Sequence, residues 1–471
     1  MTALALMWFV LAGLLLVRVL DVRTKWARVL IPLTIVCTPY VSICLTYYYC
    51  SSQYAFAFLL AILSVWCVRQ SDSFPEILAG AMSLMFALSI YQSNIGVAAV
   101  LCLMVLILRF LREPQTYLKN RKLALRMIGM IVIGAGAYYI VLRCVLAIRH
   151  LSMSSYKGAD NISVGYLLQH FPTGAEHTYA DFFCYFFGTD LAVNYYAARF
   201  FYVVVFILAL IAFFYALWKA RAERMPSFLC VVGMLFLPSF GSLIDIAAPD
   251  TRLTLLTASN MLLFLPFALS LVELFPKRTG EDKKAGAVSR FCCIACSLAT
   301  CCLIWSFVLQ VNANTLTMKY EQDKTLYLAN RILTQVETPN KQTPLLITGN
   351  PSKGDYPCIL KTANQVDRYS RWGMLWGGYT AAMNGWNELY RQHFGVQLNF
   401  CSVEQYQAIA VIKEFAKMPN YPAERSIKTI DGVLVVKVSD TKGWGKIKAW
   451  VYEKPYTGGM TVVDQFNYSI L

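Results

Sequence analysis

The amino-acid composition excludes an ordinary soluble protein. The chain has 471 residues, of which 57% are hydrophobic and only 15% are charged, whereas soluble domains carry about a quarter charged residues. A net charge of +15 would suit a nucleic-acid-binding protein, but most basic residues before position 311 fall in short loops between apolar runs, as membrane topology requires. We therefore predict a polytopic α-helical membrane protein, with the lipid bilayer as a partner and no nucleic acid.

Apolar runs of nearly membrane-spanning length recur through the first two thirds of the chain. A transmembrane helix needs about 20 apolar residues, and the runs that approach this length are 3–20, 29–48, 53–68, 74–91, 94–111, 124–148, 198–218, 228–246, 252–275 and 291–311. Basic residues follow every second run, beginning with the first, and the positive-inside rule places these loops in the cytoplasm. The sequence thus predicts a transmembrane domain of about ten helices over residues 1–311.

Two neighbouring runs predict a transmembrane hairpin. Ile77–Ile90 and Ile95–Leu108 are joined only by the four polar residues Tyr91–Asn94, and a basic cluster follows the second run. That cluster marks the cytoplasmic end, so the short link faces the other side. Tyr91 and Gln92 therefore offer a hydroxyl and an amide at the outer face, either to line a substrate site or to cap the turn.

Two longer segments are predicted outside the cytoplasm. The loop 149–197 contains the aromatic stretch Tyr179–Phe187, which is typical of a helix lying at the membrane interface. Residues 312–471 predict a small α/β domain with a helix over 318–337, a strand over Leu345–Thr348, a helix over 403–417 that begins after Ser402, and a hairpin of 426–430 and 433–438 around Asp431-Gly432.

Side chains of the predicted C-terminal domain leave two questions open. Cys358 and Cys401 would be able to form a disulfide outside the cytoplasm. The tryptophans Trp372, Trp376 and Trp386 suit either a saccharide site or the core of the domain.

The charge pattern also bears on the start of the chain. By the alternation of basic loops, the first helix begins outside the cytoplasm, yet only two or three residues precede it. No basic segment and cleavage site typical of a signal peptide is present. We therefore expect a further helix and its outer loop upstream of Met1.

Three groups of residues carry a resemblance to a known family. They are Leu88-Ser89-Ile90-Tyr91-Gln92; Tyr156-Lys157-Gly158 ahead of the long outer loop; and Met418-Pro419-Asn420-Tyr421-Pro422 with Ser426-Ile427, Asp431-Gly432 and Val435-Val436-Lys437. With the order of the helices, they resemble the bacterial O-antigen-modifying glucosyltransferases of the phage-type Gtr type II family. The resemblance implies a GT-C-type enzyme of the bacterial inner membrane, with an extracytoplasmic C-terminal domain.

The resemblance also implies a reaction. Such enzymes transfer glucose from a polyprenyl-phosphate carrier to a surface polysaccharide such as O-antigen or a component of lipopolysaccharide. Family members carry acidic residues in the outer loop between their first two helices, where GT-C enzymes place the catalytic base. The present sequence begins where the second helix would begin, so this base is not assigned here.

Transfer from a lipid phosphate requires cations that stabilise the departing phosphate. The arginines that break the positive-inside pattern are the candidates: Arg143 and Arg149 at the outer end of the sixth run, Arg199, and Arg252. Arg252 is distinguished by two nearby carboxylates, Asp245 and Asp250. The alternative roles are anchoring to lipid headgroups and, for Arg252, an ion pair that closes the helix hairpin.

Transfer also requires a carboxylate that deprotonates the acceptor hydroxyl. The carboxylates predicted at the outer face are Asp160, Glu176, Asp181, Asp190, Asp245 and Asp250. Spacing alone selects none, so Asp181, Asp245 and Asp250 remain weak candidates for the catalytic base. Glu76 and Glu273 are instead expected at the inner membrane interface.

The sequence contains no glycine-rich phosphate loop for a nucleotide sugar and no ligand cluster for a metal. We expect no cofactor besides the lipid-linked sugar, with dependence on a divalent metal left open. Two other functions remain as alternatives: a flippase of lipid-linked sugar, against which the absence of paired helix repeats speaks, and an inactive truncated relative.

Overall fold

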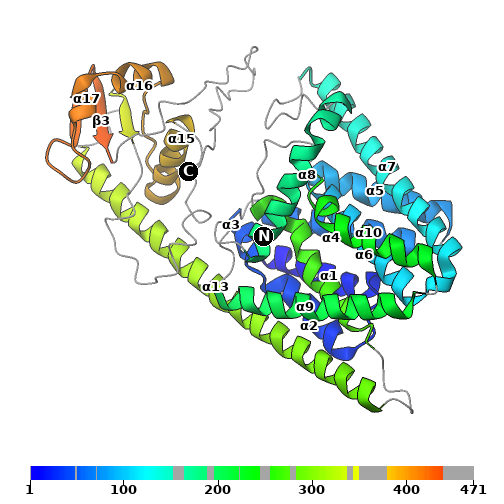
Figure 1. Ribbon diagram of the computed structural model, residues 1–471. Coiled ribbons are helices and arrows are strands. Elements are labelled where there is room, and N and C mark those ends of the chain that lie inside the picture. Colours follow the sequence, from blue (N-terminus) through cyan, green and yellow to red (C-terminus); the bar gives the residue numbers. More distant parts are fainter. Residues whose placement is uncertain are drawn as a thin grey trace. The chain divides into compact units, whose positions relative to one another are not determined.

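The chain folds as two compact units, Met1–Asn312 and Ala313–Leu471, drawn in the computed structural model of Figure 1. The boundary falls within the long helix α13 (Lys283–Gln335), which contributes residues to both units. The structure describes residues 2–47, 50–70, 72–151, 164–187, 196–221, 223–243, 255–275, 283–336, 343–348 and 379–438.

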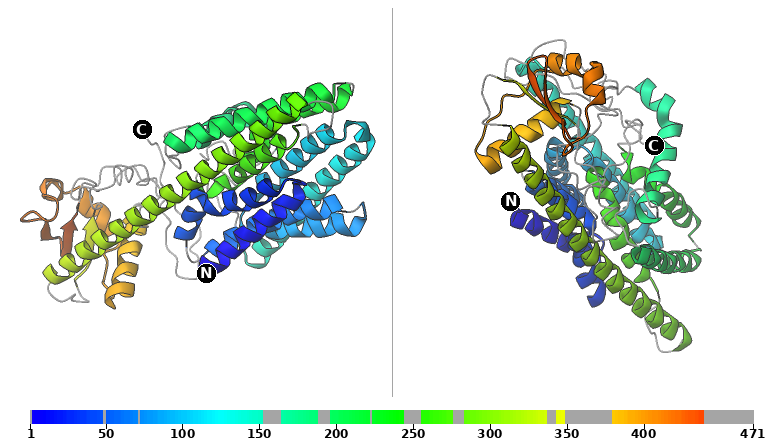
Figure 2. Two further views of the ribbon diagram at one scale, coloured as in Figure 1. Left: turned by 90° about the horizontal axis from the view of Figure 1, so that it is seen from below. Right: turned by 90° about the vertical axis from the view of Figure 1, so that its left-hand side faces the viewer.

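Unit 1 is built entirely from helices in its described residues, and Figure 2 shows them running side by side. The first half contains α1 (Thr2–Val19), α2 (Lys25–Cys37), α3 (Pro39–Thr46), α4 (Ser51–Gln70), α5 (Phe74–Ile90), α6 (Asn94–Arg112), the 3-10 turn η1 (Pro114–Thr116) and α7 (Tyr117–Ile148). The second half contains α8 (Val164–Phe187), α9 (Tyr196–Lys219), α10 (Arg224–Gly241), η3 (Leu255–Leu263), α12 (Phe264–Val272) and the beginning of α13.

Among these described helices, seven are long and apolar enough to cross a membrane, or eight if the bent pair α2 and α3 forms one span. At the other two predicted positions the structure has shorter apolar helices, Phe74–Ile90 and Ala258–Val272. Helices of 17 and 15 residues are about 23–26 Å long, less than the roughly 30 Å of a bilayer core. The prediction of about ten spans therefore exceeds the seven or eight that the described chain satisfies by length.

The bend between α2 and α3 has a local cause. Thr38 is extended, with φ −62° and ψ 143°, and it precedes Pro39 at the first position of α3. A residue before proline is driven out of the helical region because the proline ring clashes with its backbone. The two helices meet at an angle of 42° for this reason.

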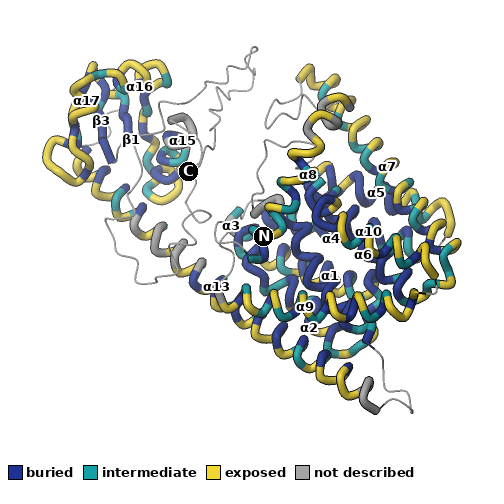
Figure 3. Tube along the Cα trace, in the orientation of Figure 1, coloured by how far each residue is buried: buried dark blue, intermediate teal, exposed yellow. Residues whose placement is uncertain are grey.

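Helices of unit 1 differ greatly in how far neighbours cover them. In Figure 3 α6 is dark blue along most of its length, whereas α7 is largely exposed. Close packing depends on small residues: a Cβ built on Gly80 of α5 would lie 2.8 Å from the Ser64 carbonyl oxygen of α4. The exposed apolar side of α7 is the kind of surface that a bilayer covers.

The aromatic helix of the loop 149–197 is present as α8, but its last turns pack inside unit 1. Tyr185 and Phe186 are buried, and the Phe186 ring lies 5.0 Å from that of Tyr202 on α9 and 5.8 Å from that of Phe264 on α12. Tyr185 and Phe186 thus pack in the core of unit 1, whereas Phe183 of the same stretch is exposed, and the position of α8 at the membrane surface stays a prediction. Apolar rings serve the core as readily as the interface, and the sequence does not separate the two.

In its described residues, unit 2 contains a three-stranded sheet in the order β1-β3-β2. β1 (Leu345–Thr348) is parallel to β3 (Val433–Lys437), and β2 (Ile427–Ile430) is antiparallel to it. Asp431 and Gly432 join β2 to β3 with φ values of 48° and 77°, the left-handed pair that a two-residue hairpin prefers. The helices of this unit are α15 (Tyr379–Leu389), the single π turn η6 (Tyr390–Phe394), α16 (Val403–Ala410) and α17 (Lys413–Lys417).

The core of unit 2 forms between this sheet and the end of α13. Trp386 and Tyr390 are fully buried and stacked with their ring centroids 6.0 Å apart, so Trp386 serves the core. Burial raises the pKa of the Tyr390 phenol, and its hydroxyl donates to the Ala329 carbonyl of α13 at 3.0 Å. Cys401 is buried in the same core, while Cys358, Trp372 and Trp376 lie outside the described residues.

Two predicted helices of unit 2 have different bounds in the structure. The helix expected over 318–337 is the end of α13, which continues without a break from the preceding apolar segment. No glycine or proline occurs between positions 287 and 336, so the change from apolar to polar residues does not end the helix. The helix expected over 403–417 is two helices separated at Val411 and Ile412, the first with Ser402 in a capping box.

Residues that carried the family resemblance in unit 2 stabilise one another. The buried Lys437 ammonium donates to the Met418 carbonyl at 2.8 Å, and the Tyr421 amide donates to the Lys437 carbonyl at 2.7 Å. A buried ammonium requires such acceptors. These contacts join the segment around Met418–Tyr421 to the end of β3.

Candidate functional site

The link between α5 and α6 forms a tight turn, as predicted. The Tyr91 amide donates to the Ala87 carbonyl and ends α5. The Asn94 amide and side chain both donate to the Tyr91 carbonyl, at 3.2 and 3.1 Å. These hydrogen bonds satisfy backbone groups that the helix ends leave free, so the turn is well defined without charged residues.

Tyrosines from two other helices hold this turn. The Tyr91 ring lies 5.1 Å from the Tyr54 ring of α4 in an edge-to-face arrangement, which favours aromatic pairs. The exposed Gln92 amide donates to the Tyr138 hydroxyl of α7 at 2.9 Å. Sequence reasoning identified Tyr91 and Gln92 but missed Tyr54 and Tyr138, because nothing in the sequence shows that α4 and α7 lie beside the turn at these residues.

The first turn of α6 crosses α10 in direct backbone contact. A Cβ built on Gly96 would lie only 2.0 Å from the Gly241 carbonyl oxygen, and one on Gly241 would lie 2.9 Å from the Asn260 amide nitrogen of η3. Only glycine permits such an approach. The crossing brings the hairpin turn, the end of α10 and η3 to one end of unit 1.

Buried uncharged polar groups gather around this crossing. Asn94 and Asn260 are 2% and 1% exposed, and in the described part of the chain their side-chain oxygens have no hydrogen-bond partner, nor does the Ser93 hydroxyl. The Asn260 amide nitrogen lies 3.5 Å from the Ser242 hydroxyl, a weak contact. A buried polar atom without a partner costs about 1–3 kcal/mol, so these groups are candidates for hydrogen bonds to a ligand.

Of the three predicted catalytic carboxylates, the structure describes only Asp181. Asp181 is half-buried on α8, one turn after Thr178, whose hydroxyl lies 3.2 Å from that of Ser239 near the end of α10. Asp245, Asp250 and Arg252 lie outside the described residues. Their segment, 244–254, follows the end of α10 and precedes η3, so the described chain on both sides of it belongs to the Gly96 crossing.

The predicted phosphate-binding arginines of the sixth run lie at the end of α7. Arg143 and Arg149 are exposed in the last turns of α7 and immediately after it. Arg143 follows Tyr138 by five residues, a rise of about 7.5 Å along the helix. Among the described residues, no group of three His, Cys, Asp or Glu side chains is placed to hold a metal ion.

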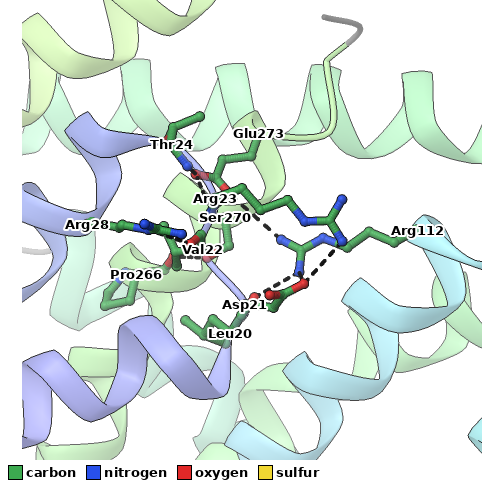
Figure 4. Close-up of polar contacts among 10 residues, drawn as sticks. All are labelled: Leu20, Asp21, Val22, Arg23, Thr24, Arg28, Arg112, Pro266, Ser270 and Glu273. Atoms are coloured by element: carbon green, nitrogen blue, oxygen red, sulfur yellow. Dashed lines mark hydrogen bonds and ion pairs between the residues drawn. The ribbon is translucent and has the colours of Figure 1, made fainter.

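Sequence reasoning missed an ionic cluster at the other end of unit 1, shown in Figure 4. Glu273 was expected at the membrane interface, but its side chain is only 3% exposed. Its carboxylate accepts from the amides of Arg23 and Thr24 at 3.0 and 2.8 Å and lies 3.8 Å from the Arg112 guanidinium. Acceptors near the free amides of a helix N-terminus stabilise it, so Glu273 holds the beginning of α2.

These features define a polytopic helical membrane protein with a buried, uncharged polar site beside a hairpin turn. The family model for glucosyl transferase GtrII matches residues 1–270, more than half of the 471 residues. The chain therefore belongs to the glucosyl transferase GtrII family, and the resemblance seen in the sequence is confirmed. No curated protein and no solved structure matches it.

The extent of the match bears on the site. Residues 1–270 include the hairpin turn, the Gly96 crossing and every candidate site residue from Tyr91 to Arg252. Unit 2 lies beyond it. Family membership as a glucosyltransferase thus rests on the unit that contains the candidate site.

Proposed function

We propose that this protein transfers glucose, or another hexose, from a polyprenyl-phosphate carrier to O-antigen or a related surface polysaccharide, by GT-C-type chemistry. The observation that supports this most is the match of the glucosyltransferase family to residues 1–270, which contain the buried polar site. In the proposal, that site faces the outside of the bacterial inner membrane, and unit 2 is extracytoplasmic.

In the proposed reaction, an acceptor hydroxyl attacks C1 of the lipid-linked sugar. The bond between C1 and the phosphate oxygen breaks, the hydroxyl proton passes to a carboxylate, and polyprenyl phosphate leaves. Asp245 and Asp250 are the preferred bases because their segment begins three residues after Gly241 and ends just before η3. Arg252 would stabilise the phosphate, and Asp181 remains a third carboxylate on a neighbouring helix.

Uncharged groups of the site would hold the sugar. Hydroxyl-rich ligands are recognised by side-chain amides and hydroxyls, which both donate and accept. The oxygens of Asn94 and Asn260 lack a partner in the described structure, and Gln92 at the exposed turn reaches Tyr138. We assign Asn260 to the sugar because it lies closest along the chain to the segment 244–254.

The exposed side of α7 would accommodate the polyprenyl tail. Apolar side chains such as Ile133, Ile140 and Val145 are exposed there, with Arg143 and Arg149 at the end of the helix. An apolar tail along the helix would bring its phosphate toward these cations, which can snorkel to the headgroup level.

The proposal is tested in cells that make polyprenyl-phosphate glucose. The full chain is expressed, and transfer of labelled glucose to surface polysaccharide is measured. Loss of a general base typically reduces the rate by about 10²–10⁴-fold, so Asp245→Asn or Asp250→Asn should abolish detectable transfer. Glu176→Gln, an exposed carboxylate of α8, is the matched control. No transfer by the unaltered chain at full expression would contradict the proposal, and movement of the lipid-linked sugar without transfer would favour a flippase.

A further inference from the structure

A cavity of about 180 Å³ lies at the end of α6 opposite to the hairpin turn. It is formed by the end of α1, the following residues Asp21 and Arg23, the ends of α4 and α6, and the beginning of α7. A single water needs only roughly 10–15 Å³ by the same kind of measure. The cavity is therefore large enough for a group of several heavy atoms.

Positive charge dominates the wall of this cavity. Two carboxylates, Asp21 and Glu113, face five cations: Arg23, Arg69, Arg109, Arg112 and Lys119. The lining thus has a formal charge of +3, and +2 if the nearby Glu273 is counted against Arg112. Like charges held together at a partly covered site repel one another unless an anion neutralises them.

Two of these arginines are held in place by α1. Arg69 donates to the Arg18 carbonyl, and Arg112 donates to the Leu20 carbonyl at 2.9 Å. These contacts satisfy carbonyls at the end of α1 and fix both guanidinium groups at the wall of the cavity (Figure 4 shows Arg112). The cations are thus positioned by the fold before any ligand arrives.

The wall also has more donors than acceptors. The Arg112 side chain is 10% exposed, and in the described structure its Nη2 has no hydrogen-bond acceptor, since Glu273 is 3.8 Å away. Arg69 Nε likewise has none. Buried guanidinium donors without acceptors are costly, and several oxygens on one anion would satisfy them.

We infer that this cavity binds a phosphate group with a net negative charge, carried by an anionic lipid headgroup or present as the free ion. Guanidinium groups match phosphate oxygens in geometry and charge, and basic pockets between transmembrane helices on the cytoplasmic side bind anionic headgroups. The site is distinct from the proposed transfer site because it lies at the other end of α6, so its failure would leave the glucosyltransferase proposal intact.

The test uses the purified full chain in detergent and native mass spectrometry. Retention is compared for phosphatidylglycerol, whose headgroup is anionic, and phosphatidylcholine, whose headgroup has no net charge, with and without added inorganic phosphate. The variant combines Arg109→Gln with Lys119→Gln, so that Arg69 and Arg112 keep their hydrogen bonds to the carbonyls at the end of α1. The matched control combines Arg121→Gln with Lys122→Gln, two exposed cations outside the cavity.

We expect phosphatidylglycerol to be retained over phosphatidylcholine, and the cavity variant to weaken its binding at least tenfold while the control does not. Competition by inorganic phosphate would show that the phosphate group alone suffices, and lack of competition would show that the lipid is needed. Equal retention of the two lipids, or equal binding by the two double variants, would overturn the inference.

A variant that is expected to strengthen binding separates an effect on the site from a loss of folding, because an unfolded protein would not bind more tightly. Glu113→Gln removes an exposed carboxylate from the rim and makes the lining more positive. It should tighten binding of phosphatidylglycerol several-fold, and this gain should shrink as salt increases because exposed charges are screened. Unchanged or weaker binding by this variant would also contradict the inference.

Discussion

The two ends of α6 are stabilised by different chemistry. At the Asn94 end, neighbouring helices supply neutral amides and hydroxyls, several of which have no partner among the described residues. At the Arg112 end they supply carboxylates and backbone carbonyls that pair with cations. The helix α6 has 19 residues and is about 28 Å long. Neutral groups can exchange hydrogen-bond partners with a ligand, whereas removing one partner of a buried ion pair is strongly destabilising. The two proposals accordingly place a sugar at the neutral end of α6 and an anion at the ionic end.

The largest expected effect concerns the ionic end. Glu273→Gln removes the buried charge that holds the beginning of α2 and faces Arg112. Breaking one partner of a buried ion pair costs about 3–5 kcal/mol, so the free energy of unfolding should fall by about that amount in a detergent-based unfolding measurement. The exposed Glu113→Gln should change it by no more than about 0.5 kcal/mol. An equal decrease in the free energy of unfolding for the two variants would contradict the claim that the buried Glu273 stabilises the protein more than the exposed Glu113.

The next effect concerns the neutral end. Gly96→Ala places a methyl group 2.0 Å from the Gly241 carbonyl oxygen, so α6 and α10 must move apart. Overpacking of this kind costs about 1–3 kcal/mol, measured as a lower unfolding temperature. Gly129→Ala on α7 would meet no described atom within 4 Å and should be neutral or stabilising by about 0.5–1 kcal/mol. A stable Gly96→Ala protein would contradict the close crossing.

A smaller effect is expected at the hairpin turn. Tyr138→Phe removes the acceptor of the exposed Gln92 amide, and an exposed hydrogen bond contributes about 0.5–1 kcal/mol. Tyr139→Phe, at the neighbouring exposed position, is the control. A double-mutant cycle with Gln92→Ala isolates the pair. A coupling energy of zero would mean that the two side chains do not interact in solution.

The smallest effect on stability is expected on α7. Arg143→Gln and Arg149→Gln change exposed side chains, so the unfolding temperature should stay within the range typical of surface substitutions. If these cations bind the donor phosphate, the apparent KM for polyprenyl-phosphate glucose should rise in a transfer assay. Lys122→Gln at the basic end of α7 is the matched control, and an unchanged KM in all three variants would exclude the arginines from donor binding.

The sequence predicted those features that depend on local patterns. The hairpin turn at Tyr91–Asn94, the Asp431-Gly432 turn and the three strands of unit 2 lie where apolar periodicity and turn residues placed them. It did not show what tertiary packing decides: Tyr185 and Phe186 of α8 belong to the core, and α13 continues through the change in composition at its middle. Neither the Gly96 crossing nor the role of Glu273 has a local signal, because both depend on residues more than a hundred positions apart.

Asn260→Leu tests the central claim most directly, because it separates binding from stability. The Asn260 side-chain oxygen is buried and has no hydrogen-bond partner in the part of the chain that the structure describes, so an apolar residue of similar size should leave the free energy of unfolding unchanged or raise it. If this end of α6 binds the sugar, labelled-glucose transfer should fall at least tenfold in the same variant. Such a loss of activity without a loss of stability is typical of residues that serve function at some cost to stability. Transfer that stays at the level of the unaltered chain, with a protein that is less stable, would show that Asn260 serves packing and would contradict the account.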